Sequence, residues 1–441
     1  MRQVDTILTA KWVVPIIPAQ TVYHQYAIVI DQGEILALMP HSEVFEHYQA
    51  ITHVDYPTHV ISAGFVNAHT HLAMNVLRGL ADDLPLDEWL NDYIWPAEQA
   101  SLSDQMVYDG TAHAAVESVQ TGVTCVNDHY FFPEAVARAL KDVGLRGRLT
   151  HCWFAFALPW VSDPADYAAA SQALLQKYHD SKERLQATLG PHAPYTVNDA
   201  IMQQVTDWSN AYQVPVHIHM HETAKEVADF KQQTGQSPVA YYGQKGWLHS
   251  RFMAVHMTQM DATDLSWLVK SGASVVHCPE SNMKLASGMA RVDALLKAGV
   301  NVALGTDGAA SNNDLDFFGE MKSAAFLGKL QSGTEALPAY QVLEMATING
   351  AKALGLADQI GSIEVGKQAD LIAVDLSDVS TQPVYSPISQ LVYAAGRHQV
   401  TDVWISGQPI LRNRQMQTVP PDQVNQNIER WAGPLREKLL S

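Results

Sequence analysis

Eight short apolar runs, separated by longer stretches with helical periodicity, constrain the fold more than any other feature of this sequence. The runs are GFVNAHTH, GVTCVNDHY, RLTHCWFA, LQATLGPHA, VPVHIHMHE, RFMAVHMT, SVVHCPES and VNVALGTD. They are rich in Val, Ile and Thr, and stretches such as DQMVYDGTAHAAVESVQTG lie between them. Eight strand-plus-helix units within roughly 250 residues are typical of a parallel barrel. We therefore predict an α/β fold built on a TIM-like (β/α)8 barrel.

Shorter alternating segments flank this region on both sides. ILTAKWVVPI and YAIVIDQGEILALMP precede it, and GSIEVGKQADLIAVDL and VTDVWISGQPILRNRQM follow it. Such alternation, broken by glycine and proline, is typical of strands in a small antiparallel layer. We expect residues 1–60 and 363–441 to form the two halves of one small β-sandwich domain, with the barrel, residues 61–362, inserted between them. The second half includes a C-terminal helix whose amphipathic pattern is interrupted by Gly433 and Pro434.

Polar residues gather at the right-hand end of each apolar run. They are His69 and His71, Asp128 and His129, His192, His219 to Glu222, His256, His277 to Glu280, and Asp307. In a parallel barrel the carboxyl ends of the strands meet at one face, where the chemistry is located. The sequence therefore predicts a functional site assembled from these strand ends.

The first run ends in a His-x-His pair. On an extended chain, side chains at i and i+2 point the same way, so His69 and His71 can offer both imidazoles to one metal ion. The alternative is a pair of packed or solvated histidines at a strand end. In the fifth run His217, His219 and His221 share one face, so periodicity does not choose a ligand among them, and His217 is also compatible with an interior, supporting position.

Asp307, in ALGTDGAAS, follows the eighth run and precedes small residues, which would expose its carboxylate at the mouth of the barrel. Its alternative role is to cap the next helix. Three histidines and one aspartate form a site suited to Zn²⁺ or Fe²⁺, with a water molecule completing the coordination shell. Because such an ion lowers the pKa of bound water to about 7, the site would supply a hydroxide nucleophile.

Charge and composition narrow the class of partner. The chain has 28 Lys and Arg against 46 Asp and Glu, a net charge of −18, which disfavours nucleic acid and favours a small uncharged or zwitterionic ligand. The amino terminus lacks a signal-peptide pattern and no run approaches a membrane span, so we expect a cytoplasmic protein without a membrane partner. Cys125, Cys152 and Cys278 lie within apolar runs, and we expect buried, reduced thiols.

Several longer motifs carry a family resemblance over essentially the whole chain. They are WPAEQ, GPHAPYTV, HMHET, HCPESNMKLASG, GTDGAASNNDLD and GKQADLIAVDL. Together with the His-x-His pair they resemble the amidohydrolase superfamily, and within it the 5'-methylthioadenosine/S-adenosylhomocysteine deaminases. The same branch contains chlorohydrolases and guanine or cytosine deaminases.

The resemblance implies roles for individual residues. The metal ligands would be His69, His71, His219 and Asp307. One metal per subunit is expected, Zn²⁺ with Fe²⁺ as the alternative, because LQATLGPHA lacks the lysine that members with two metals carry. Glu222 would protonate the ring nitrogen, and His256 would steer the attacking hydroxide.

The substrate contacts follow from the same resemblance. Glu98, in WPAEQ, would hold the two ribose hydroxyls, His192 would contact the substrate, and Ser311 would support Asp307. A surface position is the alternative for Glu98. Trp89, Tyr93 and Trp95 would either wall a thioether pocket or serve as packing and subunit-interface aromatics, and His129 and His277 are expected behind the site rather than in contact with substrate.

The implied reaction is hydrolytic deamination at C6 of adenine in 5'-methylthioadenosine or S-adenosylhomocysteine, with adenosine as a further candidate. Hydroxide attacks C6, with Asp307 accepting its proton, while Glu222 protonates N1, which requires a raised Glu222 pKa in a dry pocket. Arg78, Arg146 and Arg148 are interpreted as structural or solvated, which favours methylthioadenosine. The resemblance also implies a homo-oligomer.

Two other functions are compatible with parts of the sequence. The first is another amidohydrolase of the same branch, either a triazine hydrolase or chlorohydrolase, or a guanine- or cytosine-type deaminase. The second is a non-catalytic barrel kept for binding or assembly, against which the complete set of ligands and acid argues.

Overall fold

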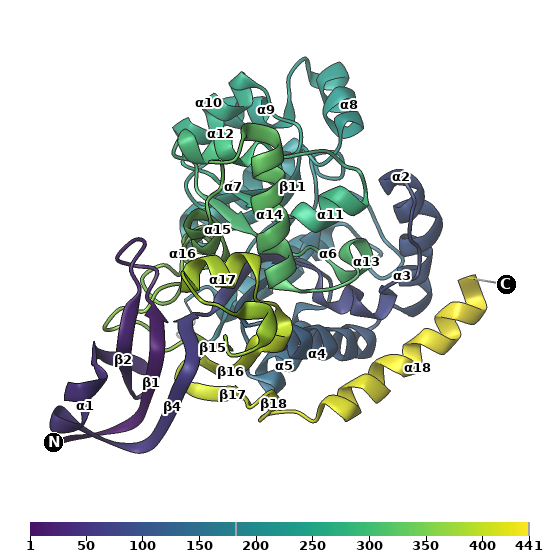
Figure 1. Ribbon diagram of the computed structural model, residues 1–441. Helices are drawn as coiled ribbons and strands as arrows, with labels where there is room; N and C mark the ends of the chain where they lie inside the picture. Colours follow the sequence, from purple (N-terminus) through teal and green to yellow (C-terminus); the bar gives the residue numbers. More distant parts are fainter. Residues whose placement is uncertain (181–182, 440–441) are drawn as a thin grey trace.

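Each of the eight apolar runs contains a strand in this computed structural model, which describes residues 1–180 and 183–439 (Figure 1). The strands are β5 (Phe65–Thr70), β6 (Val123–Asp128), β7 (Arg146–Leu149), β9 (Leu185–Ala187), β11 (Val216–Met220), β12 (Phe252–His256), β13 (Ser274–His277) and β14 (Val302–Leu304). The third and fourth runs also contribute a short parallel pair, β8 (Cys152–Trp153) and β10 (Gly190–Pro191).

These strands form parallel sheets in the order in which they occur along the chain. Within the described residues, one sheet has the order β5-β6-β7-β9 and another the order β11-β12-β13-β14. A parallel bridge joins Leu189, after β9, to Val216 in β11, and another joins Thr70, at the end of β5, to Asp307, after β14. The two sheets are therefore hydrogen-bonded to each other at both outer edges.

Helices lie between successive strands along the chain and also follow the last of them (Figure 1). They are α4 (Asp104–Gln120), α5 (Pro133–Val143), α6 (Ala165–Tyr178), α7 (Asp199–Tyr212), α8 (Ala224–Thr234), α9 (Pro238–Lys245), α10 (Ala262–Ser271), α11 (Pro279–Lys284), α12 (Val292–Lys297), α13 (Ala309–Asn312), α14 (Phe317–Ser332), α15 (Ala339–Ala346) and α16 (Ile348–Ala353). Their ends follow local chemistry: the Ser103 side chain caps α4, an Asp261–Asp264 capping box starts α10, and α10 ends at Gly272 in the left-handed conformation (φ +71°).

The insertion between β5 and α4 contains four short helical segments. They are η1 (Leu72–Leu77), α2 (Leu86–Glu88), η2 (Trp89–Ile94) and α3 (Trp95–Ser101). Figure 1 shows α2 and α3 together on the right, with α18 running past them.

The two ends of the chain share one mixed sheet. Its order is β18-β17-β16-β15-β4-β1-β2-β3 within the described residues. The bounds are β1 (Arg2–Val14), β2 (Tyr23–Asp31), β3 (Glu34–Pro40), β4 (Tyr48–Ala63), β15 (Leu371–Asp375), β16 (Val400–Ile405), β17 (Gln408–Arg412) and β18 (Gln415–Met416). Antiparallel pairing of β4 with β15 joins the amino-terminal and carboxyl-terminal strands.

The expectation of a purely antiparallel layer is wrong at one pair, because β1 and β4 are parallel. The β2–β3 hairpin and helix α1 (His41–His47) lie between β1 and β4 in the sequence. After them, β4 pairs with the other edge of β1 and runs in the same direction as β1. The hydrogen bonds define a single sheet here, and the two-layer sandwich stays a prediction.

The carboxyl-terminal region adds helices outside this sheet. They are η3 (Val379–Thr381), α17 (Pro387–Tyr393), η4 (Arg397–Gln399) and α18 (Pro421–Leu439). Helix α18 packs against α4, where Trp431 Nε1 donates to Asp109 Oδ2 at 3.0 Å. It is continuous through Pro434, so the expected interruption does not break the helix, although the proline ring removes one helix hydrogen bond.

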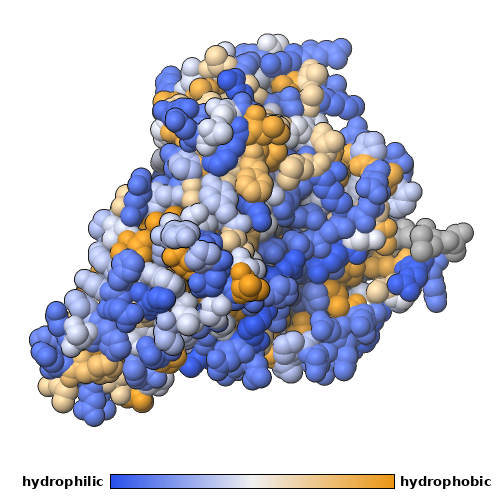
Figure 2. Space-filling view, viewed as in Figure 1, coloured by the Kyte–Doolittle hydropathy of each residue, from blue (hydrophilic) through white to orange (hydrophobic). Residues whose placement is uncertain are grey.

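The surface and interior match the composition. The face in Figure 2 is mostly hydrophilic, with scattered apolar residues, as the net charge of −18 leads one to expect. Cys125, Cys152 and Cys278 are buried and free of disulfides within the described residues. Within the same part of the chain, none of the helices is both long enough and apolar enough to cross a bilayer.

Candidate active site

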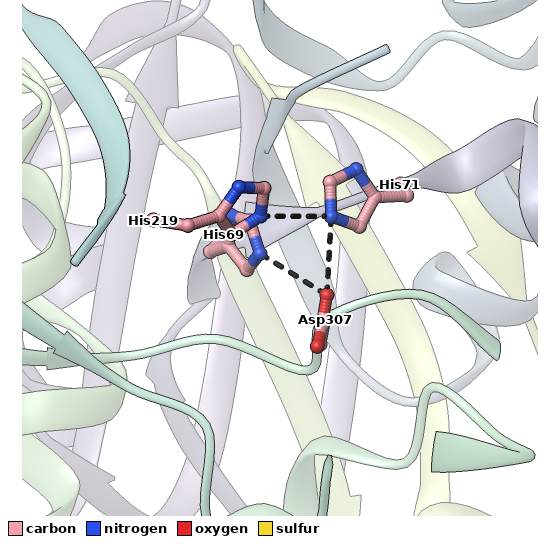
Figure 3. Close-up of side chains that lie close together, drawn as sticks. All are labelled: His69, His71, His219 and Asp307. Atoms are coloured by element: carbon pink, nitrogen blue, oxygen red, sulfur yellow. Dashed lines mark hydrogen bonds and ion pairs between the residues drawn. The ribbon is translucent and has the colours of Figure 1, made fainter. Parts of the chain in front are cut away.

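Four side chains from three distant parts of the chain meet at the carboxyl ends of the strands (Figure 3). His69 lies on β5, one residue before its end, His71 follows β5, His219 lies on β11 and Asp307 follows β14. One potential ligand atom from each lies within 4.8 Å of all the others. Asp307 Oδ1 is 3.1 Å from His69 Nε2 and 3.2 Å from His71 Nε2, and His71 Nε2 is 3.3 Å from His219 Nε2.

The hydrogen bonds made by two of the imidazole rings fit a bound cation. His71 Nδ1 donates to the His129 carbonyl at 2.5 Å, and His219 Nδ1 donates to the His192 carbonyl at 2.9 Å. In neutral rings, both Nε2 atoms then carry lone pairs, and these face each other at 3.3 Å. Burial holds the pKa of His219 well below its usual value, so that ring is neutral. A divalent ion between the lone pairs would turn this repulsion into coordination.

Asp307 supplies the negative charge of the cluster. Burial by itself would raise its pKa, but the neighbouring His69 and His71 rings hold the pKa of Asp307 well below its usual value. Its second oxygen, Oδ2, accepts from Ser281 Oγ at 2.7 Å and from Ser311 Oγ at 3.1 Å. The carboxylate is therefore ionised and held on both sides, as expected of a metal ligand with outer hydrogen bonds.

The strand ends pack closely enough to bring these ligands together. A Cβ on Gly305 would lie 2.8 Å from His69 Cβ and 2.9 Å from its carbonyl oxygen, so only glycine permits this approach of β14 to β5. His256 (φ +76°) and Asp307 (φ +62°) adopt the left-handed conformation, which is rare outside glycine. Such strain is concentrated at functional positions, where surrounding contacts impose it.

Glu222 and His256 lie beside the ligand cluster. Glu222 Oε2 is 3.8 Å from His256 Nε2, and His256 Nδ1 donates to Asn282 Oδ1 at 2.9 Å. Burial raises the pKa of Glu222, and the negative charge of Asp307 adds to that effect against the opposing influence of His256. A raised pKa favours the protonated carboxyl, which can act as a general acid.

Glu98 is also buried, not exposed on the surface. It lies on α3, its residue is 4% exposed, and Tyr130 Oη donates to its Oε1 at 2.5 Å. Burial raises its pKa to about 7.

His192 follows β10 and stacks on Phe154 with ring centroids 4.4 Å apart. Burial lowers the pKa of His192 to about 3, so its ring is neutral.

One cavity connects these groups. His71, His219, Asp307, Glu222, His256, Glu98, His192 and Ser311 all line it. Trp89 and Trp95 form part of its wall, whereas Tyr93 is absent from the described lining. Further wall residues, which the sequence did not single out, are Phe131, Phe154, Phe156, Leu158, Trp160 and Tyr195. The signal that could have found some of them is the aromatic density of CWFAFALPW after the third strand.

The remaining histidines occupy supporting positions. His217 Nε2 lies 2.8 Å from His69 Nδ1, so His217 is behind a ligand, in agreement with the interior alternative. His221 Nδ1 donates to the Gln259 carbonyl at 2.6 Å. His129 accepts from His71 through its carbonyl and also lines the cavity, and His277 is buried. Ser281, Asn282 and Tyr130 were not predicted, although two of them lie in the motif HCPESN.

Comparisons with known proteins agree with this geometry. The model of the amidohydrolase family matches residues 60–410. A 5-methylthioadenosine/S-adenosylhomocysteine deaminase from Teredinibacter turnerae is 41% identical over 437 residues, which cover 99% of this chain and 98% of the relative. Another of the same description, from Saccharophagus degradans, is 41% identical over 97% of this chain and 96% of its own length.

A solved structure extends the likeness to three dimensions. An adenosine deaminase from Xanthomonas campestris with bound zinc is 44% identical, covers 99% of both chains and superposes with a TM-score of 0.97. The family model, the full-length relatives and this superposition all point the same way: the chain belongs to the amidohydrolase family and, within it, to the 5-methylthioadenosine/S-adenosylhomocysteine deaminases.

Proposed function

We propose that this protein catalyses hydrolytic deamination at C6 of the adenine ring of 5'-methylthioadenosine or S-adenosylhomocysteine, with adenosine as a further candidate. The products are ammonia and the inosine analogue. The observation that carries the proposal is the convergence of three imidazoles and one carboxylate beside a buried carboxyl, Glu222, whose pKa is raised. The names and full-length similarity of the relatives support the choice of substrate.

His69, His71, His219 and Asp307 would hold one divalent ion per subunit, which we assign as Zn²⁺ with Fe²⁺ as the alternative. Three nitrogen donors and one oxygen donor suit zinc, and a zinc-bound relative supports the assignment. When bound, such an ion supplies a water molecule whose pKa is lowered to about 7.

The protein's own groups would manage the protons. Asp307 takes up the proton released as the water attacks C6, and Glu222 delivers a proton to N1, which disrupts the aromatic ring and permits addition. His256, held by Asn282 and 3.8 Å from Glu222, would orient the water. Asp307 then passes its proton to the amino group, which leaves as ammonia, and the proton of the new C6 hydroxyl passes to Glu222 as the C6 carbonyl forms.

Substrate binding would use the outer groups of the cavity. Glu98 accepts both hydroxyls of the ribose, with Tyr130 fixing one of its oxygens. His192, stacked on Phe154, contacts the substrate, and Ser311 supports the reaction indirectly by holding Asp307.

The finer architecture is part of the same proposal. We assign residues 61–362 to a closed (β/α)8 barrel, which is supported by the bridges from Leu189 to Val216 and from Thr70 to Asp307. Residues 1–60 and 363–441 would form the small β domain, supported by the shared terminal sheet. Residues 440–441 of that range lie outside the described part of the chain.

The reaction would take place in the cytoplasm, since three buried free cysteines suit a reducing compartment. No nucleic-acid or membrane partner is proposed, and the homo-oligomer stays a prediction.

The test is a substrate panel on protein purified without chelator, with metal content measured on the same sample. We expect ammonia release and the ultraviolet change of adenine to hypoxanthine with methylthioadenosine, and much lower kcat/KM with guanine, cytosine and an s-triazine. Activity on a triazine that survives Glu98→Ala would favour the triazine hydrolase alternative. Protein that lacks both metal and activity would favour a non-catalytic barrel.

A further inference from the structure

We infer that the outer part of the cavity is a subsite for an uncharged alkylthio group at the 5' position, and that it discriminates against a carboxylate there. This inference rests on the proposed function. It separates methylthioadenosine, as substrate, from 5'-thio analogues that carry a carboxylate; S-adenosylhomocysteine carries both a carboxylate and an ammonium there.

The direction of the substrate in the cavity identifies the relevant wall. With C6 at the ligand cluster and the ribose at Glu98, the 5' substituent continues toward the mouth. Exposure rises in that direction along one segment: Phe154 is 3% exposed and stacks on His192, whereas Phe156 is 42% exposed. Leu158 and Trp160 complete this wall, so a 5' group would contact apolar and aromatic surface.

No arginine or lysine occurs among the described residues that line the cavity. A carboxylate drawn into it would lose water without gaining a cationic partner, and an unpaired charge in such surroundings is costly. A thioether with an alkyl group loses little hydration and gains dispersion contacts with the aromatic wall.

The arginines that the sequence offered are engaged elsewhere. Arg78 pairs with Glu117, Arg146 Nε lies 2.8 Å from Asp370 Oδ2, and Arg148 Nη1 donates to the Ala187 carbonyl at 2.8 Å. Each therefore has a structural partner outside the cavity.

Two lysines adjoin lining segments, and both are neutralised by acids. Lys284 Nζ is 2.6 Å from Asp82 Oδ1, and Lys225 Nζ is 2.7 Å from Asp229 Oδ2 and 3.9 Å from Asp87 Oδ2. The insertion that supplies Leu86 and Trp89 to the wall reads ADDLPLDEWLNDY, with five acids and no basic residue. The potential at the mouth therefore opposes an approaching carboxylate.

A series of 5'-thioadenosines tests the inference on the metal-loaded enzyme. The compounds carry methyl, butyl, 3-carboxypropyl or the methyl ester of 3-carboxypropyl on sulfur, and S-adenosylhomocysteine is the fifth. We expect kcat/KM for the butyl compound at least equal to that for the methyl compound. We expect the free acid to be about 100-fold lower and S-adenosylhomocysteine to be lower by a smaller factor, because its ammonium can pair with the acids at the mouth. The ester should be restored to nearly the methyl value.

A second experiment introduces a cation into the cavity wall. Phe156→Arg should raise kcat/KM for the 3-carboxypropyl compound about tenfold relative to methylthioadenosine, and the neutral control Phe156→Gln should leave that ratio unchanged. An unchanged ratio in Phe156→Arg would place the 5' group elsewhere and overturn the assignment of this wall.

The outcomes separate this inference from the proposed function. If S-adenosylhomocysteine and the free acid are deaminated as well as the methyl compound, or if the ester is as poor as the acid, the discrimination by charge is overturned while the deaminase function stands. If metal-loaded enzyme deaminates none of the five adenine nucleosides, the proposed function itself fails.

Discussion

Nε2 of His217, on β11, lies 2.8 Å from Nδ1 of His69, on β5, behind the ligand cluster. If His69 Nε2 is to bind a cation, the single proton of its neutral ring must be on Nδ1, and His217 is the acceptor for that proton. The contact therefore selects the tautomer and ring orientation that coordination requires.

Replacing His217 should weaken metal binding without altering the ligands themselves. We expect His217→Phe to lower the affinity for Zn²⁺ by about 10- to 100-fold, because the proton on His69 Nδ1 loses its acceptor. Competition with a chromophoric chelator measures this affinity independently of activity. His217→Gln, whose amide oxygen can accept the same hydrogen bond, is the matched control, and equal losses in the two variants would argue against a tautomer effect.

Ser281 should matter more than Ser311 in holding Asp307. Both hydroxyls donate to Asp307 Oδ2, Ser281 at 2.7 Å and Ser311 at 3.1 Å. Loss of a hydrogen bond to a charged group costs about 1.5 to 3 kcal/mol, so Ser281→Ala should weaken Zn²⁺ binding by roughly tenfold or more, and Ser311→Ala by less. Chelator competition on both single variants and the double variant measures the order and the coupling; the reverse order would contradict the assignment.

Glu222→Gln should abolish proton delivery and leave the metal in place. The amide has nearly the same shape but cannot serve as an acid, so kcat should fall by about 100- to 10,000-fold. Metal content and melting temperature should match those of the unmodified protein. A fall of less than tenfold would show that another group protonates the ring.

Glu98→Gln should stabilise the protein above pH 7 while impairing nucleoside binding. The folded-state pKa of Glu98 is about 7, above its ordinary value of 4.5, so the folded state holds the proton more tightly. The contribution of Glu98 to stability is therefore most favourable below pH 4.5 and declines as the pH rises from 4.5 to about 7. Above pH 7 the buried charge costs about 3 kcal/mol, a cost that the neutral Gln side chain avoids.

Melting temperatures of both proteins at pH 5 and pH 8 test this effect. The gain from Glu98→Gln should be clear at pH 8 and small at pH 5, and KM for methylthioadenosine should rise. Glu98→Ala, which leaves the Tyr130 hydroxyl without its acceptor, is the contrasting variant and should not show the same gain. An equal gain at both pH values would mean that the buried charge is not its source.

Much of the architecture is visible in the sequence because it depends on local pattern. Each of the eight apolar runs holds a strand, and polar residues at their right-hand ends lie at one face. The parallel β1–β4 pair escaped prediction, because strand direction depends on the path of the intervening hairpin and helix and not on alternation.

The identity of the ligands was only partly contained in local pattern. His69 and His71 are adjacent in space because alternation on one strand puts them there, but His217, His219 and His221 satisfy the same periodicity. Only the register of β11 against its neighbours decides which ring meets Asp307, since moving two residues along a strand shifts a side chain by about 7 Å. His219 reaches the cluster, while His217 ends behind His69.

The sequence by itself determined which chemical groups are available and at which strand ends they lie, because these properties are encoded within a few neighbouring residues. Only the tertiary structure decided that Ser281 and Ser311 share one oxygen of Asp307, that Tyr130 holds Glu98, and that no arginine faces the outer cavity in the described part of the chain. These relationships join residues far apart in the sequence, and close packing of the whole molecule sets their distances.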